Sequence, residues 1–183
     1  MAADREGIRV DGISLGLFLL RVVIGVTVVL HGYNHIWGGG KIKGTAGWFG
    51  SLGMKPAIVH AWLASIVELA AGGLLIVGLL TPFAAAGVVG VMTVAFMINH
   101  RTNGFFIFRP GEGYEYVLNL AVAGLALSAT GAGQWSIDHA LGGKVLGIEM
   151  GGTPGFIIGM VGGVGGGLAL LAACWRPEPK AAD

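Results

Sequence analysis

Hydrophobic residues of this chain gather in five long runs separated by shorter polar stretches. Each run has roughly 17 residues or more, which is long enough to span a bilayer as a helix. The runs cover residues 13–30, 57–80, 82–98, 114–130 and 154–175. No part of the sequence alternates in polarity as the strands of a membrane β-barrel do. The pattern therefore predicts an all-α fold, a polytopic helical bundle in a membrane.

Prolines mark the starts of three of these helices. Pro56 precedes the second run, and the pairs Thr81-Pro82 and Thr153-Pro154 stand where the third and fifth runs begin. Threonine can cap a helix, and proline fits the first helical turn. Because almost no chain separates the second run from the third, we expect these two helices to form a tight antiparallel hairpin.

Two connections are long enough to hold short helices of their own. In the connection after the first run, Thr45 is positioned to cap a helix that carries Trp48. Tryptophan is common at headgroup depth, so this helix either lies in the membrane interface or forms a lid over a polar site. In the connection before the fifth run, Ser136 is a plausible N-cap and His139 is expected to be solvated.

Composition supports the membrane assignment. The 183 residues are 54% hydrophobic and only 11% charged, whereas a soluble domain has about 25% charged residues. The net charge of +1 does not indicate nucleic acid binding, and the single cysteine, Cys174, allows neither an internal disulfide nor a zinc motif. No small-residue cleavage site follows Leu30, so we expect the first run to be a retained helix.

Polar residues are concentrated at one end of the predicted helices. If the helices alternate in direction, this end brings together His31, His35, His60, Glu68, Asn99, His100, Tyr114, Glu115, Tyr116 and Asn119. Ionisable groups inside a membrane are costly and indicate a functional site. The same face carries most of the cations: Lys41, Lys43, Lys55, Arg101, Arg109, Arg176 and Lys180, against Arg5, Arg9 and Lys144 on the other face. The positive-inside rule then places the polar face and the C-terminus in the cytoplasm.

Arg21 and Glu68 are the two charges expected deepest in the membrane. Each lies ten or eleven residues, hence roughly 15 Å, from the polar face, if that face is level with His31 and Ala57. Opposite charges at one depth on adjacent helices should pair, because an unpaired buried charge is costly. Such a pair can fix helix register or serve function, and the sequence leaves both readings open.

The histidines at the polar face allow several chemistries. His31 and His35 share a helical face if the first helix continues past Leu30, and either could oppose His100 across a haem. Nothing in the spacing selects a metal or haem, and we expect neither. Glu115 is explained by the helix dipole, or it is a proton acceptor beside His100, as a quinol site requires.

The fifth run has a repeating glycine pattern. Gly155, Gly159, Gly163 and Gly167 recur every four residues and form one stripe on a helix. Small residues at this spacing allow close packing between membrane helices. The stripe could face an internal helix, a second copy or another protein, and we slightly favour a neighbouring protein.

Several short motifs, taken together, resemble the DoxX family of small bacterial and archaeal membrane proteins. They span about residues 13–141 and include Leu20-Arg21, His31-Gly32, Glu68-Leu69-Ala70-Ala71-Gly72-Gly73, Thr81-Pro82, Asn99-His100, Gly111-Glu112-Gly113-Tyr114-Glu115-Tyr116 and Trp135-Ser136-Ile137-Asp138. The resemblance implies a four-helix core similar to the small subunit of archaeal thiosulfate:quinone oxidoreductase. The positions that match family motifs are Arg21, His31, Gly32, Glu68, His100 and Glu115. The family usually has a lysine soon after His-Gly, where this chain has His35, and the difference argues against an anionic substrate.

The sequence therefore predicts a multi-pass protein of a bacterial or archaeal inner membrane. We expect an N-terminal tail (1–12), a DoxX-like core (13–141), a loop (142–153), an added helix (154–175) and a C-terminal tail (176–183). Its expected function is that of a redox-system subunit which binds a quinone or similar small apolar molecule. The ligand-binding candidates are Arg21, His31, Glu68, His100 and Glu115. The alternative is a non-catalytic accessory subunit of a larger membrane complex, joined through the fifth helix. A transporter ranks last, because no inverted repeat is evident.

Overall fold

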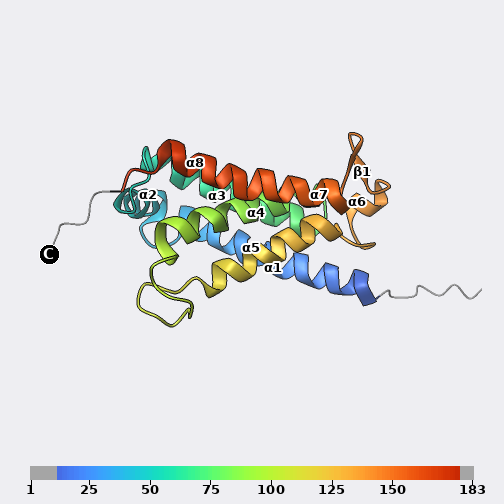
Figure 1. The fold of residues 1–183 in the computed structure, drawn as a ribbon, viewed down its shortest axis with the longest axis horizontal. Coiled ribbons are helices and arrows are strands. Elements are labelled where there is room, and N and C mark those ends of the chain that lie inside the picture. Colours follow the sequence, from blue (N-terminus) through green and yellow to red (C-terminus); the bar gives the residue numbers. More distant parts are fainter. Residues whose placement is uncertain (1–11, 178–183) are drawn as a thin grey trace, which may run out of the picture.

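Five long helices run side by side along one axis in the computed structural model, which describes residues 12–177 (Figure 1). They are α1 (Gly12–Trp37), α3 (Ala57–Val77), α4 (Thr81–Ala95) with the π-helical segment η1 (Phe96–His100), α5 (Glu115–Thr130), and a fifth helix formed by α7 (Gly152–Ile158), the π-helical segment η2 (Gly159–Gly165) and α8 (Gly166–Cys174). Four of the five are long and apolar enough to cross a membrane, and α5 is shorter, with 16 residues. The predicted helical membrane bundle is confirmed.

Short elements close the two ends of the bundle. Helix α2 (Lys41–Ser51) lies at the end of the bundle where the fifth helix ends, and α6 (Ile137–Ala140) with the hairpin of β1 (Lys144–Val145) and β2 (Ile148–Glu149) lies at the other end (Figure 1). Arg5, Arg9 and Lys180 of the predicted tails lie outside the described part of the chain.

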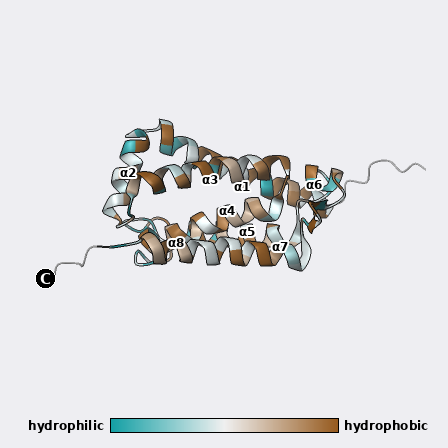
Figure 2. Cartoon of the chain, turned by 90° about the horizontal axis from the view of Figure 1, so that it is seen from above, coloured by the Kyte–Doolittle hydropathy of each residue, from teal (hydrophilic) through white to brown (hydrophobic). Residues whose placement is uncertain are grey.

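Helix α4 is the centre of the bundle. It packs against α3, α5 and the fifth helix, while α1 packs on the far side of α3. Viewed from above, α1 and α3 lie on one side of α4 and the fifth helix lies on the other (Figure 2). The buried residues of α4 are mostly small, including Ala84, Ala85, Ala86, Val88 and Val89. Small side chains let membrane helices approach closely, which is why one helix can contact three others.

Two helix ends differ from the sequence prediction. Helix α1 continues past Leu30 to Trp37, whereas α3 ends at Val77 and not at Leu80. The end of α3 is a Schellman turn: Gly78 has φ 68°, and the Leu79 N–H donates to the Leu74 carbonyl at 3.0 Å. A side chain at residue 78 would also lie 3.0 Å from the Arg21 guanidinium carbon, so both conformation and space require glycine here.

The predicted Arg21–Glu68 ion pair is wrong. Arg21 is 1% exposed and donates to three carbonyl oxygens, those of Leu75 (2.8 Å) and Ile76 at the end of α3 and that of Trp135. Glu68 lies two turns before Leu75 in α3, nearer to the polar face. The prediction failed because α1 is longer than expected, so that Gly32, and not a residue deeper in the membrane, packs against Glu68.

Asp138 makes the matching contact at the start of α4. Its two carboxylate oxygens accept hydrogen bonds from the N–H groups of Leu80 (2.8 Å) and Thr81 (2.9 Å), and it is 2% exposed. The positive end of a helix dipole favours a carboxylate, just as the negative end favours the Arg21 guanidinium. Ser136 caps the α6 turn that holds Asp138, as predicted, by accepting from His139 N–H at 3.1 Å.

Helix α2 begins earlier than the sequence suggested. Thr45 was expected to cap it, but the helix starts at Lys41 and Thr45 lies inside it, with its hydroxyl donating to the His35 carbonyl at 2.9 Å. This bond joins α2 to the extra length of α1. Phe49 is buried and Trp48 is 45% exposed, so one side of α2 covers the bundle end and its other side stays exposed.

The glycine stripe of the fifth helix faces the same chain. A Cβ at Gly163 would lie 2.7 Å from Val89, one at Gly167 would lie 3.1 Å from the Gly90 carbonyl, and Gly155 and Gly159 crowd Ser128 of α5. The stripe therefore packs closely against another helix, as the spacing suggested. Our slight preference for a neighbouring protein as its partner is wrong, because α4 and α5 already cover it.

Replacing Gly159 and Gly163 together with leucine should destabilise the chain itself. Both side chains would overlap α4 and α5, and overpacking typically costs about 1–3 kcal/mol per site. We expect a lower melting temperature in detergent. The control is Gly165→Leu, whose Cβ has only ordinary contact with a backbone oxygen at 3.8 Å. Equal melting temperatures for the double variant and the control would contradict this packing.

Replacing Arg21 with methionine should also destabilise the fold. The change leaves buried carbonyl oxygens of α3 and Trp135 without a donor and Asp138 without a nearby cation, at an expected cost of about 3 kcal/mol. Unfolding in mixed micelles measures this loss, and Arg101→Met, at an exposed arginine, is the control.

Because Arg21 and Glu68 are not paired, Arg21→Met and Glu68→Leu should have additive effects on the free energy of unfolding. Strong coupling between them would restore the rejected ion pair.

Candidate functional site

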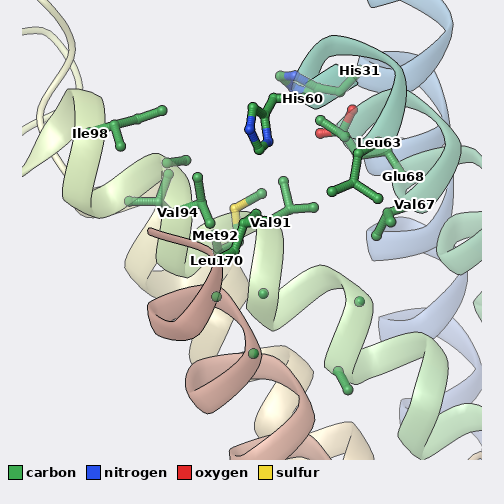
Figure 3. A pocket seen from close by; sticks show the side chains of 18 of the residues that line it. His31, His60, Leu63, Val67, Glu68, Val91, Met92, Val94, Ile98 and Leu170 are labelled. Carbon is green, nitrogen blue, oxygen red and sulfur yellow. The ribbon is translucent and has the colours of Figure 1, made fainter. Parts of the chain in front are cut away.

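A large cavity opens at the polar end of the bundle. Its volume is about 790 Å³, within the range of about 300–1,000 Å³ usual for small-molecule sites. Residues from α1, α2, α3, α4, η1, α5 and the fifth helix line it. Polar side chains stand at one end, and aliphatic residues and glycines line the remainder (Figure 3).

The polar end contains every histidine of the chain except His139. The polar side chains that line it are His31, His35, His60, Glu68, Asn99, His100, Glu112 and Tyr116. They come from four long helices and one loop, so the site depends on the assembled bundle and not on one sequence motif.

The side chains of His35 and Glu68 lie in contact between α1 and α3. His35 Nδ1 and Glu68 Oε2 are 3.1 Å apart, and neither atom has a well-aligned hydrogen bond to any described residue. The Glu68 side chain is 5% exposed. A carboxylate this buried is stabilised by a nearby donor, and His35 is placed to supply one when Nδ1 carries a proton.

His60 lines the cavity, and one of its ring nitrogens has no hydrogen-bond partner among the described residues. Its Nε2 lies 3.3 Å from the Lys55 carbonyl oxygen, which can only accept, so Nε2 carries the proton. Nδ1 of a neutral ring is then an acceptor, and it is buried without a partner among the described residues. Figure 3 shows the His60 ring and the Glu68 carboxylate both directed into the cavity.

A hydrogen bond to the loop between η1 and α5 orients the His100 ring. Its Nδ1 donates to the Glu112 carbonyl at 2.9 Å, and its Nε2 lies 3.3 Å from the Asn99 amide nitrogen. His100 ends the π-helical segment η1. A π-helical turn adds one residue to a helix and rotates the side chains beyond it, and such turns often occur at functional sites.

His31 and Tyr116 form the outer side of the polar end. The Tyr116 hydroxyl lies 3.3 Å from His31 Nε2, and the two rings stack with centroids 5.9 Å apart. His31 is exposed and Tyr116 half-buried, so this pair connects the cavity with the surroundings of the protein. It also joins α1 to α5, which otherwise have few contacts.

Three of the five predicted ligand-binding residues line the cavity: His31, Glu68 and His100. Arg21 does not, because it lies at the other end of α3. Glu115 does not line it either. Its Oε2 accepts from the Ile107 N–H at 3.2 Å and organises the loop before α5, so our expectation of a shared cavity with Glu115 is wrong.

The sequence-based set of ligand-binding candidates omitted five polar residues that line the cavity: His35, His60, Asn99, Glu112 and Tyr116. His35 could have been included from its i, i+4 spacing to His31, which places both on one face of the longer α1. His60 and Tyr116 were grouped with the polar face by depth, but no spacing to another polar residue selected either of them as a ligand contact. Among the described residues, no group of three or more His, Cys, Asp or Glu is arranged to hold a metal ion.

Comparison with known proteins identifies one family. No curated protein and no solved structure matches the chain. The match to a family covers residues 16–101, from the first turns of α1 to the residue after η1, and so excludes α5 and the fifth helix. The region contains most of the polar end of the cavity, including His31, Glu68 and His100. The chain therefore carries a DoxX family domain over residues 16–101.

Proposed function

We propose that this DoxX-domain membrane protein is a subunit of a redox system and binds a hydroquinone, or a similar apolar molecule with a polar ring, in the cavity. The observation that carries the proposal is the cavity itself, which joins an apolar wall to a polar end where Nδ1 of His60 has no partner among the described residues. An unsatisfied buried acceptor costs about 1–3 kcal/mol, so a ligand that supplies a donor gains this free energy on binding.

The chemistry of the polar end favours the reduced form of such a ligand. Nδ1 of His60 and the carboxylate of Glu68 are both acceptors. Hydroquinone hydroxyls are donors, whereas the carbonyls of the oxidised quinone can only accept. Two buried acceptors therefore bind the hydroquinone in preference to the quinone.

The same residues can take up protons. Oxidation of a hydroquinone releases two protons and two electrons, and imidazole and carboxylate are the usual proton acceptors near neutral pH. His60 would accept one proton, the His35–Glu68 pair the second, and the exposed His31–Tyr116 pair would pass protons out. The two electrons would go to a redox centre in a partner protein. The resemblance of the sequence motifs to the small subunit of thiosulfate:quinone oxidoreductase is a further reason to propose a quinone-type ligand.

An accessory subunit without a ligand is the second candidate, although the contacts of the fifth helix weaken it. Its main support in the sequence was the glycine stripe, which packs against α4 and α5. Native gel electrophoresis of gently solubilised membranes tests for the partner complex that both candidates require. We expect the protein to migrate with a redox enzyme, whereas migration only as its own small oligomer would exclude the accessory role and would leave the proposed redox subunit without its electron acceptor.

Replacing His60 with phenylalanine should weaken hydroquinone binding about tenfold, the effect of losing one hydrogen bond to a buried group. Phenylalanine keeps the ring and removes the acceptor. Titration calorimetry in detergent, without oxygen, compares benzohydroquinone with benzoquinone. Affinity for benzoquinone should change little, because its carbonyls do not donate to His60.

The matched control is His139→Phe, at an exposed residue at the opposite end of the bundle. It should bind benzohydroquinone as the parent does. Equal loss in both variants, or no binding by the parent, would overturn the proposed function. A second readout is mass spectrometry of lipids extracted from protein purified without oxygen, in which we expect a hydroquinone to be retained by the parent and depleted in His60→Phe.

A further inference from the structure

The cavity extends far beyond the polar end, and its apolar part is open at the side. From the polar end it continues between α3 and the fifth helix, over a floor formed by α4. Leu63 on α3 and Val161 on the fifth helix line it, yet they are 41% and 67% exposed. In a membrane-spanning bundle such residues face the hydrocarbon, so this part of the cavity is a groove open to the bilayer.

We infer that the ligand carries a hydrocarbon tail, and that the tail lies in this groove between α3 and the fifth helix and emerges into the bilayer. The inference rests on the proposed function for the position of the polar ring. The fifth helix lies outside the DoxX match, so one wall of the groove is a feature of this chain added to the family domain.

Glycines of the fifth helix fall into two sets with different surroundings. Gly159 and Gly163 are crowded by α4 and α5, whereas Gly162 and Gly166 line the cavity. A Cβ at Gly162 would make ordinary contact with Ala86 at 3.5 Å, and one at Gly166 would meet nothing within 4 Å. The first set is required for packing. The second set is not, and its effect is to keep the groove wide.

Small residues form part of the floor of the groove, beside larger side chains of α4 such as Val91 and Val94. Ala86, Gly87 and Gly90 of α4 line it, while larger aliphatic side chains stand at its sides, among them Val67 of α3 and Leu170 of α8 (Figure 3). A flexible chain of methylene groups fits such a surface, because attraction in a membrane comes from close contact and not from removal of water.

A tail fits the groove better than a partner helix does. The groove is continuous with the polar end, where Nδ1 of His60 would stay without a donor if an apolar helix filled the groove. One amphipathic molecule, with a donating ring and a hydrocarbon tail, satisfies both parts of the cavity together.

The test is Gly166→Phe, which places a large ring in the groove without disturbing helix packing. The matched control is Gly165→Phe, at the adjacent exposed glycine that does not line the cavity. Binding of decyl-substituted benzohydroquinone and of unsubstituted benzohydroquinone is measured by calorimetry at one detergent concentration. Gly166→Phe should weaken binding of the decyl compound about tenfold or more, since the ring occupies the space of the tail, and should leave the tailless compound unchanged. Gly165→Phe should match the parent for both.

Each other result overturns the inference. If Gly166→Phe binds the decyl compound as the parent does, or weakens both compounds equally, the tail does not lie against the fifth helix, and the proposed function stands. If the parent binds neither compound, the proposed function fails and the inference fails with it.

Discussion

The buried guanidinium of Arg21 is the contact on which the remaining structure depends. It binds the last carbonyls of α3 and the carbonyl of Trp135, so it joins α1, the α3–α4 turn and the segment that carries Asp138. Asp138 in turn caps α4. A cation at the C-terminal end of one helix and an anion at the N-terminal end of the next neutralise both dipoles at a single turn. This arrangement ties α1 to the C-terminal end of α3 and to the start of α4.

Hydropathy was sufficient to predict the membrane helices, because bilayer thickness sets the length of an apolar run. It was not sufficient for register. Nothing in the pattern indicated that α1 would include the polar residues up to Trp37, and that error moved Arg21 away from Glu68. Helix rotation was equally hidden, since helices that are apolar all round have no hydrophobic face to orient them. His31, His60, Glu68, His100 and Tyr116 could therefore be grouped by depth, but depth did not show which of them line the cavity, and Glu115 could not be excluded.

Two parts of the chain line the cavity and contribute different kinds of residue. The DoxX domain supplies His60, Glu68 and most of the other polar contacts, and the fifth helix supplies an apolar wall that the family match does not include. The polar contacts of the cavity and the shape of its apolar wall can therefore change independently, through substitutions in different parts of the chain. A substitution on the outer wall alters which molecules enter, and the buried acceptors that would handle protons stay as they are.

The open side of the groove determines how the affinity for a ligand relates to the occupancy of the site. A molecule that enters between α3 and the fifth helix is drawn from the lipid phase, where hydrophobic compounds accumulate to far higher concentrations than in water. Occupancy is then governed by abundance per unit of membrane, and a weak intrinsic attraction is enough to fill the site. Selectivity among the many apolar molecules of a membrane consequently falls on the few polar atoms at its inner end, and a host cell could regulate the protein simply by altering the composition of its lipid pool.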